Sequence, residues 1–250
     1  MELSAICTYL DEHLDVARFE DYPGAFNGLQ LEQRGPVTRL AAAVDACQFT
    51  IDAAAAEGAD LLLVHHGLLW DGAGPFIGPR YRRLAAALSA NLGVYSSHLP
   101  LDAHPELGNS IGLVRALELE PAEPFGDHRG QPLGFVVECD FDRAAWAQRV
   151  EVAVGGAVRV LPTGPEQVRR VAVVTGSAAS FLDDARAAGC DTLLTGEARH
   201  STYLEAEEAG LNVCLAGHYA TECFGVKALA AHLADRFGLA WSFIEHDTGL

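Results

Sequence analysis

Two stretches of the sequence alternate short β-prone segments with helical segments, and this alternation restricts the fold more than any other feature. The first stretch predicts strands and helices in the order 39–45, 50–57, 60–65, 81–90 and 94–98. The second predicts the same order over 168–174, 181–188, 191–195, 202–209 and 213–216. Strands that are separated by helices of this length form βαβ units. The sequence therefore predicts two similar α/β domains with mainly parallel sheets, related by an internal pseudo-duplication.

The remaining segments place the predicted domain boundary. Ser4 is a candidate N-cap for a helix over 5–19, and turn signals fill 22–30. A segment over 121–130 is rich in proline, glycine and charge, and is followed by a strand over 133–139, a helix over 143–154 and a strand over 158–161. We expect a first domain over 1–126, completed by a C-terminal segment of about 219–250, and a second domain over 127–218. The β-prone stretch 239–245 could join either sheet.

A pair of histidines follows the most apolar of these strands. The run Leu61-Leu62-Leu63-Val64 predicts a strand buried on both faces, and it ends on His65-His66-Gly67. Open α/β sheets bind ligands outside the carboxyl ends of their strands, so both imidazoles should face a crevice. The plainer alternative is a hydrogen-bonded structural pair.

A histidine followed four residues later by a carboxylate ends the third strand of each stretch. These motifs are His98-x-x-x-Asp102 and His218-x-x-x-Glu222. Taken singly, Glu222 could be an ordinary carboxylate in the first turn of a helix, and Asp102 could be a loop or capping residue. Together with His65 and His66, they bring ligand-type side chains to three strand ends. The pattern favours a metal site between the two domains for Zn, Fe, Mn or Ni.

Composition excludes several classes of protein. The net charge of −17 opposes a nucleic-acid groove, which needs clustered cations. No apolar run is long enough for a transmembrane helix, and the N-terminus does not look like a signal peptide. Six cysteines without a C-x-x-C pair fit reduced thiols. We expect a cytoplasmic protein that binds neither nucleic acid nor membrane.

Several blocks carry a family resemblance. They are Asn27-Gly28-Leu29-Gln30, Leu63-Val64-His65-His66, His98-x-x-x-Asp102, Gly108-Asn109, Thr195-Gly196-Glu197-x-x-His200 and Gly217-His218-x-x-x-Glu222. With these blocks the chain resembles the NGG-interacting-factor-three-like proteins, also named GTP cyclohydrolase I type 2 homologues. The resemblance implies a two-domain α/β subunit, a dinuclear metal centre and a toroidal homohexamer. Carried over by position, the metal ligands would be His65, His66, Asp102, His218 and Glu222, with Glu222 bridging two divalent ions.

The resemblance leaves the activity open, since some members are linked to GTP cyclohydrolase activity and others to transcription. One hypothesis is a metal-dependent hydrolase of a small molecule, with His98 as a catalytic proton donor or as a residue behind the ligands. A phosphate-bearing substrate would need amides near Gly176-Ser177 or an arginine, because the chain has no Walker loop. The rival hypothesis is a non-catalytic metal-binding or regulatory scaffold. The chain also has Gly24-Ala25-Phe26-Asn27 where the family typically has Trp-Asp-Asn, which predicts a lost carboxylate near the site.

Overall fold

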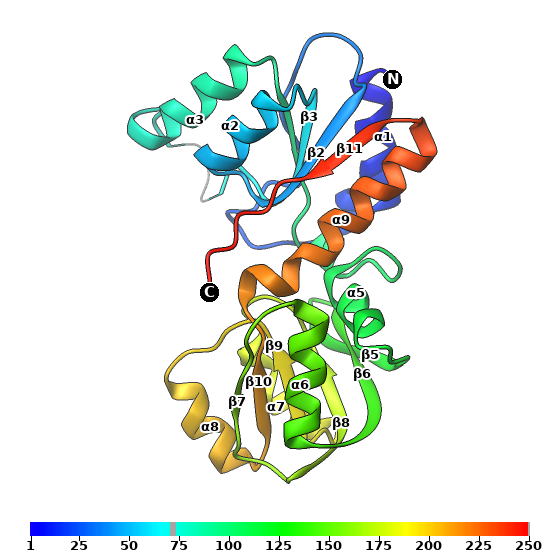
Figure 1. Cartoon of the computed structure of the whole chain (residues 1–250), viewed down its shortest axis with the longest axis vertical. Helices are drawn as coiled ribbons and strands as arrows, with labels where there is room; N and C mark the ends of the chain where they lie inside the picture. The colour runs from blue at the N-terminus through cyan, green and yellow to red at the C-terminus, as the bar shows by residue number, and fades with distance from the viewer. Residues whose placement is uncertain (71–73, 250) are drawn as a thin grey trace. The chain divides into compact units, whose positions relative to one another are not determined.

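The chain forms two compact units, each built around its own sheet. The computed structural model describes residues 1–70 and 74–249 (Figure 1). Unit 1 comprises Met1–Leu101 and Gly225–His246, and unit 2 comprises Asp102–Phe224 with the C-terminal residues from Asp247. Leu250, the last residue of the predicted C-terminal segment, lies outside the described residues. The predicted α/β class is confirmed, whereas the predicted domain boundaries stay a prediction.

Unit 1 contains a five-stranded sheet that is mainly parallel. Its strand order is β1 (Gly28–Leu31), β4 (Gly93–Ser96), β3 (Leu61–His66), β2 (Arg39–Asp45) and β11 (Ala240–Phe243). Only the pairing of β1 with β4 is antiparallel among these strands. The central strands are almost entirely buried because their side chains are apolar on both faces. The C-terminal strand joins this sheet beside β2, which answers the question that the sequence left open.

The helices of unit 1 follow the predicted pattern with one clear exception. They are α1 (Leu3–His13), the short 3-10 helix η1 (Val16–Arg18), α2 (Gln48–Ala56), α3 (Gly78–Ser89) and the later part of α9 (His218–Phe237). The prediction that the first helix runs over 5–19 from a Ser4 cap is wrong. The helix begins after Glu2, and Asp15 has a left-handed backbone, with φ of 50°, which ends the regular helix.

Unit 2 contains a six-stranded sheet that is mixed rather than mainly parallel, which corrects the expectation. Its order is β5 (Pro121–His128), β6 (Gln131–Asp142), β8 (Gln167–Val173), β9 (Thr192–Thr195), β10 (Asn212–Leu215) and β7 (Arg159–Leu161). The pairs β8–β9 and β9–β10 are parallel, and the outer pairs are antiparallel. The turn at Arg129-Gly130, where both φ values are positive, joins β5 to β6 as a hairpin, and a tight hairpin can only be antiparallel.

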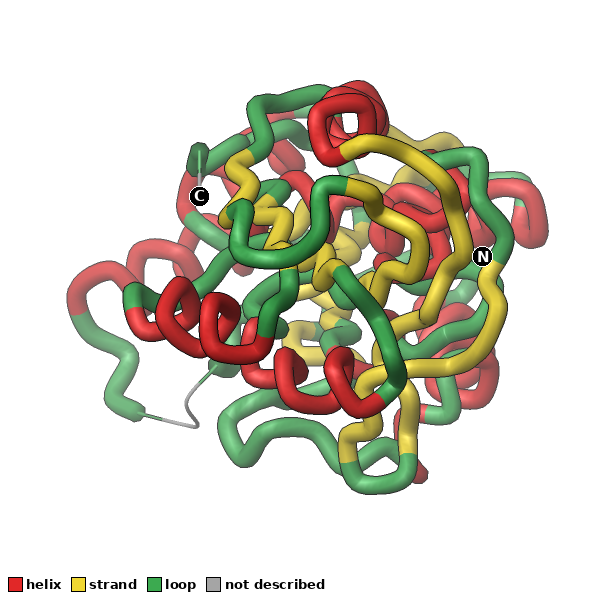
Figure 2. The backbone as a smooth tube through the Cα atoms, turned by 90° about the horizontal axis from the view of Figure 1, so that it is seen from below, coloured by secondary structure: helices red, strands yellow, loops and turns green. Residues whose placement is uncertain are grey.

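Helices of unit 2 flank this sheet. They are α5 (Asn109–Ala116), α6 (Arg143–Val154), η2 (Ala179–Phe181), α7 (Leu182–Ala187), α8 (Ser201–Ala209) and the start of α9, whereas α4 (Leu99–Asp102) belongs to unit 1 except for its last residue. Trp146 of α6 is fully buried in a core with Val150, Val171 and Leu194. Figure 2 lets the alternation of helices and strands be followed along the chain.

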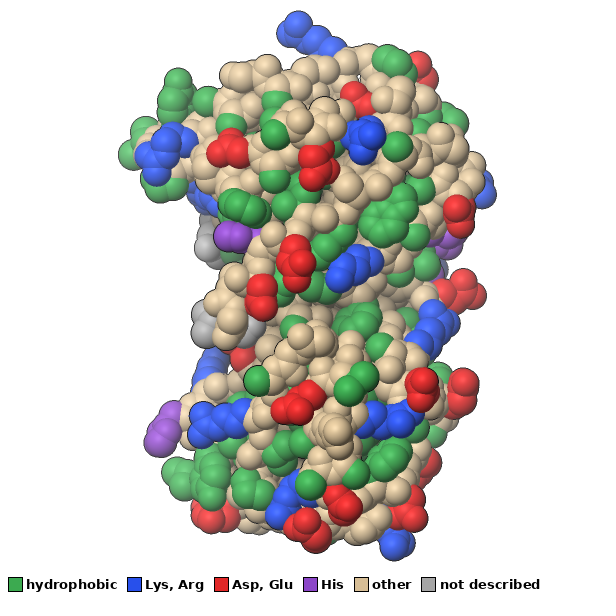
Figure 3. Space-filling model, in the orientation of Figure 1, with side chains coloured by type: hydrophobic (Ala, Val, Ile, Leu, Met, Phe, Trp, Pro, Cys, Tyr) green, Lys and Arg blue, Asp and Glu red, His purple; other side chains and the backbone are tan. Residues whose placement is uncertain are grey.

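The surface carries charges of both signs, and the helices can be compared with membrane-spanning helices. Asp and Glu side chains lie among Lys and Arg side chains over the face drawn in Figure 3. Within the described residues, no helix combines the length and the apolar character that crossing a membrane requires.

The two units repeat one local arrangement of hydrogen bonds. An aspartate precedes the second strand of each βαβ segment, Asp60 before β3 and Asp191 before β9, and its Oδ2 accepts two successive backbone N–H groups in the first half of the preceding strand or just before it. The donors are Thr38 and Arg39 for Asp60, and Arg169 and Arg170 for Asp191. The glycine two residues before each aspartate has φ near 70°, at Gly58 and Gly189. An internal duplication would leave this kind of repeated detail.

Candidate metal-binding residues

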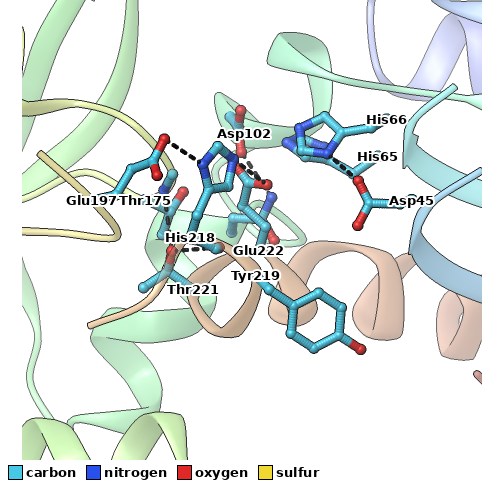
Figure 4. A network of polar contacts seen from close by, with 12 residues as sticks. Asp45, His65, His66, Asp102, Thr175, Glu197, His218, Tyr219, Thr221 and Glu222 are labelled. Atoms are coloured by element: carbon cyan, nitrogen blue, oxygen red, sulfur yellow. Dashed lines mark hydrogen bonds and ion pairs between the residues drawn. The ribbon is translucent and has the colours of Figure 1, made fainter. Parts of the chain in front are cut away.

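Strand β3 places the two adjacent histidines at its carboxyl end. His65 is fully buried and His66 is partly exposed, since successive side chains point to opposite faces of a strand. Asp45 stands beside His66 in the register of β2 and β3, and its Oδ1 accepts a hydrogen bond of 2.8 Å from His66 Nδ1 (Figure 4). The carbonyl of Ser97 accepts one of 3.0 Å from His65 Nδ1. Because these acceptors carry no proton, both rings donate from a proton on Nδ1, which leaves Nε2 as the position of the lone pair in the neutral form.

A third histidine of unit 1, His98, is held by an aspartate and an asparagine. Asp21 Oδ1 accepts from His98 Nδ1 at 2.9 Å, and the Asp21 side chain is 5% exposed. Asn27 Nδ2 donates to Asp21 Oδ2 at 2.8 Å, while Asn27 Oδ1 accepts from the His98 backbone N–H at 2.7 Å. Burial raises the pKa of Asp21, but the hydrogen bond and charge of His98 and the bond from Asn27 outweigh it and hold that pKa below its ordinary value.

These three imidazoles form a cluster within unit 1. Each of these histidines, His65, His66 and His98, has one ring nitrogen in the cluster. The three nitrogens lie within 4.8 Å of one another. The ring centroid of His98 is 4.9 Å from that of His65 and 5.6 Å from that of His66. The Trp70 ring meets His98 edge-on, with centroids 4.8 Å apart. The cluster offers nitrogen ligands of the kind that Zn, Fe, Ni and Cu accept.

In unit 2, helix α9 begins on the histidine of the second motif. His218 Nε2 lies 3.1 Å from Glu222 Oε2, one helical turn further on, and Glu197 Oε1 accepts from His218 Nδ1 at 3.1 Å (Figure 4). Burial lowers the pKa of His218, but hydrogen bonds and charge from Glu222 and Glu197 raise it to about 9. In the metal-free protein this histidine is therefore protonated at neutral pH, and a cation that binds it must displace that proton.

Two glycines pack against this histidine and glutamate. Gly176 has φ of +68°, and a Cβ there would collide with Glu222 Oε1. A Cβ on Gly196 would lie 2.7 Å from His218 Cα and 2.9 Å from Thr221 Oγ1. The Gly176 N–H donates to Thr221 Oγ1 at 3.1 Å. The loops after β8 and β9 can approach α9 this closely only because these positions lack side chains.

Asp102, the fifth predicted ligand, lies at the end of α4. Its side chain is oriented by Asn109, whose Nδ2 donates to Asp102 Oδ1 at 2.8 Å. Asn109 is fully buried at the start of α5, and Asp102 is 8% exposed. The block Gly108-Asn109 that the sequence singled out thus has a physical role, which is to fix the carboxylate of Asp102.

When the two βαβ segments are aligned by their equivalent backbone hydrogen bonds, the two His-x-x-x-acid motifs are offset by one residue. The equivalent bonds run from Ser97 N–H to Val64 and from Ala216 N–H to Thr195. Counted onward from these bonds, His98 corresponds to Gly217 rather than to His218. His98 therefore precedes α4, whereas His218 is the first residue of α9. The proposed one-to-one match of the motifs is wrong in this detail.

Comparison with known proteins identifies the family. The family model described as Duf34/NIF3 (NGG1p interacting factor 3) matches residues 1–249. The chain belongs to the DUF34/NIF3 family. A relative from Deinococcus radiodurans, named GTP cyclohydrolase 1 type 2 homolog, is 43% identical over 97% of this chain and 92% of its own length.

Solved structures of similar proteins share the whole fold. TTHA1606 from Thermus thermophilus covers 100% of both chains at 38% identity, with a TM-score of 0.89. The protein ybgI, whose function is described as unknown, also covers 100% of both chains, at 36% identity and a TM-score of 0.93. The resemblance inferred from the sequence blocks is thereby confirmed for this DUF34/NIF3 chain.

Sequence reasoning missed the residues that hold the histidines. Asp45 ends a predicted strand that neighbours the histidine strand, so the register of a parallel pair could have indicated its place. Glu197 belongs to a block that carried the resemblance, but nothing assigned it to His218. Asp21 has no signal in the sequence, because its contact with His98 spans 77 positions.

Two further expectations concern the surroundings of this site. Position 26 is Phe26, and the carboxylate that contacts the neighbouring Asn27 is that of Asp21, from a different position in the chain. The Gly176 amide cannot serve as a phosphate donor while it donates to Thr221. The Ser177 amide and the arginines stay the candidates for any anionic part of a ligand.

Proposed function

We propose that this DUF34/NIF3 protein binds two divalent ions and uses them to hydrolyse a small molecule. The proposed ligands are His65, His66, Asp102, His218 and Glu222. Imidazole and carboxylate donors suit Zn, Fe, Mn or Ni. The proposal is supported by a common feature of the three ligand histidines, each of which has an oxygen acceptor on Nδ1, from Ser97, Asp45 or Glu197. Such outer acceptors orient the Nε2 lone pair and increase its basicity toward a metal.

Three of the proposed ligands, Glu222, Asp102 and His218, have distinct roles in this proposal. These residues would hold the divalent ions, which would supply a water molecule of lowered pKa when bound. Glu222 supplies negative charge between two cations, and Asn109 keeps the Asp102 carboxylate turned to its position. His218 must lose a proton on metal loading, because its neighbouring carboxylates hold its pKa at about 9.

The observation that favours an enzyme is the Asp21–His98 pair. His98 lies against His65 and His66 but is outside the proposed ligand set, and a buried aspartate fixes its Nδ1. This leaves His98 Nε2 as the atom that can give a proton to a leaving group or take one from water. A general acid or base at this position serves a reaction, whereas a closed structural metal site does not require one.

A scaffold that binds metal without catalysis is the second candidate. It is favoured by the burial of the proposed ligands, since His65 is fully buried and Glu222 is 3% exposed. Buried ligands are typical of closed structural sites, in which protein atoms fill every coordination position.

A turnover screen separates the two candidates. The metal-loaded protein is incubated with nucleotides including GTP, phosphoesters and cyclic amides, in the presence of Mn, Zn or Fe. We expect metal-dependent hydrolysis of one class, and in the variant His98→Gln a loss of about 100-fold or more with metal content unchanged. The matched control is His200→Gln, at an exposed position, which should keep full activity. Metal-loaded protein that turns over none of these classes would favour the scaffold.

The remaining parts of the proposal concern the setting of the site. We propose a cytoplasmic protein that assembles as a toroidal homohexamer, with a small molecule as its ligand. The domain division at residues 126 and 127, with 219–250 completing the first domain, is likewise retained as a proposal about folding units.

A further inference from the structure

Unit 1 contains a pocket that the proposed metal chemistry does not use. It encloses about 240 Å³ between β1, the chain after β3 and helix α3. Its lining comprises Gln30, Leu31, Leu68, Leu69, Phe76, Arg80, Arg83 and Leu84. Sites that enclose a whole drug-sized ligand measure roughly 300–1,000 Å³, so this pocket fits a part of a ligand, of about the size of one ring.

The pocket begins where the histidine strand ends. Leu68 follows His66 by two residues, so their Cα atoms are at most about 7 Å apart. Gln30 fixes the wall at this point, because its Oε1 accepts the N–H of Leu69 at 3.0 Å and its Nε2 donates to the Phe26 carbonyl at 2.6 Å. A Cβ on Gly67 would collide with the Gln30 side chain, so this glycine allows the wall to pack tightly.

The polar groups of the pocket are cationic. Arg80 and Arg83 line it, and none of the described lining residues is an acid. Arg83 Nη1 donates to the carbonyl of Ala46 at 3.3 Å, while its Nε is buried and has no hydrogen-bond partner among the described residues. Arg83 as a whole is only partly buried, but a buried N–H donor without a partner is unfavourable unless an acceptor compensates it. In a chain of net charge −17, an acid-free pocket with two arginines favours an anionic group.

We propose that this pocket binds a planar apolar group that carries a carboxylate, as the non-reacting part of the substrate. The leucine side chains and Phe76 contact the faces of the ring, and Arg83 pairs with the carboxylate. A guanine base fits less well, because its N–H donors would meet no acidic acceptor. This inference rests on the proposed function for the role of the group as part of a substrate, but the binding itself can be tested separately.

Benzoate is the probe, and benzamide is its neutral control of the same shape. Binding to the protein as purified is followed by ligand-observed NMR and by titration calorimetry at low and high salt. We expect benzoate to bind more weakly as salt rises, and to bind at least tenfold more tightly than benzamide or guanosine. Equal affinity for benzoate and benzamide would overturn the proposal.

Substitutions in the pocket test whether benzoate binds there. Arg83→Met keeps most of the side-chain volume and should weaken benzoate at least tenfold. Arg82→Met, at an exposed position on the same helix, should change nothing. Leu84→Trp fills the pocket while Arg83 remains, and it should also abolish binding. This variant provides the test if Arg83→Met proves unstable. Unchanged benzoate affinity in a folded Arg83→Met or Leu84→Trp variant contradicts the pocket.

The variant Glu222→Gln separates this inference from the metal centre. Benzoate affinity should be the same in this variant as in the parent protein. If affinity depends on Glu222 and not on Arg83, the carboxylate binds metal and the pocket proposal fails. If affinity depends on Arg83 and the protein takes up no metal even from metal-replete medium, the pocket stands and the proposed metal function fails.

Discussion

At the scale of single residues, the histidines of the candidate site differ in the group that accepts a hydrogen bond from their Nδ1. The Nδ1 acceptors of His65, His66, His98 and His218 are a carbonyl in the first case and carboxylates in the others. A carboxylate stabilises the charged form of the ring more than a carbonyl does, because it carries a full negative charge. The acceptor on Nδ1 therefore differs in charge between His65 and the other three histidines.

The first prediction concerns the titration of His218. Its pKa of about 9 in the folded, metal-free protein exceeds its ordinary value of 6.5. The protonated ring therefore stabilises the metal-free fold fully below pH 6.5, and this contribution is lost as pH rises through 9. Metal affinity should change in the opposite sense and rise over the same window, because bound metal needs the neutral ring.

Histidine NMR on chelated protein measures this titration. We expect a midpoint near 9 in the parent and a lower midpoint in Glu197→Gln, which removes one of the two stabilising carboxylates. The exposed variant Glu205→Gln is the matched control. A parent midpoint at or below 6.5 would show that Glu222 and Glu197 do not stabilise the charged ring.

The second prediction concerns Gly176. An alanine there has an unfavourable φ of +68° and collides with Glu222, so Gly176→Ala should displace this carboxylate and reduce metal content. Gly155→Ala is the control, since φ is +71° there and nothing lies within 4 Å of the added Cβ. Both variants should lose about 1 kcal/mol of stability or more from backbone strain.

Thermal unfolding and elemental analysis test this pair together. Only Gly176→Ala should lose metal, because only its methyl group reaches Glu222. Equal metal content in both variants would mean that the carboxylate position does not matter for binding.

Residue types and spacing are sufficient to predict candidate ligands, but not the side chains that support them. His65 and His66 stand out because an apolar run ends on them. Asp21 and Asp45 do not stand out, since their role depends on contacts with residues that are 77 and 21 positions away. Contacts of this range are set by the tertiary fold, which local patterns do not encode.

At the scale of elements, the strands with uniform apolar side chains are predictable and those with mixed side chains are not. The predicted strand 39–45 has the observed bounds of β2, and the predicted helix 143–154 those of α6. Strand β1 starts next to Asn27, and the Asn27-Gly28 pair predicts a turn there instead. Strand β5 contains two prolines and a glycine, which predict a boundary, but an edge strand tolerates them since one side of it needs no ladder bonds.

The third prediction concerns the paired aspartates at the strand starts. Asp60 Oδ2 accepts from the Thr38 and Arg39 N–H groups and the Thr38 hydroxyl. Burial raises the pKa of Asp60, but these hydrogen bonds outweigh it and lower that pKa below 3.8. Its contribution to stability is therefore present above pH 3.8 and is lost as pH falls through the lowered pKa.

Substitutions at Asp60 and Asp191 compare how much each aspartate stabilises its own unit. Asp60→Asn and Asp191→Asn should each cost about 1–2 kcal/mol at neutral pH, because the strand N–H groups lose a charged acceptor. Asp235→Asn, at an exposed position near the end of α9, should cost nothing measurable. Denaturant unfolding gives the values, and an unaffected Asp191→Asn would argue against equivalent roles in the two units.

At the scale of the whole molecule, charge constrains assembly. Each chain carries a net charge of −17, so identical chains repel one another unless apolar or arginine-paired interfaces compensate. Added salt screens this repulsion. The proposed ring of six should thus be more stable at high salt than at low salt.

Light scattering after size exclusion measures the assembly. We expect six times the chain mass of 26.6 kDa at high salt, with partial dissociation at low salt. A monomer under both conditions would remove the ring from the account.

Elemental analysis of the purified protein measures whether the proposed metal centre forms. After growth in metal-replete medium, the parent should carry about two equivalents of divalent metal, and Glu222→Gln about one, because the variant removes the charge between two cations. Glu208→Gln, the same substitution at an exposed position of α8, should keep both. A parent without metal, or a Glu222→Gln variant with the full complement, would contradict the account.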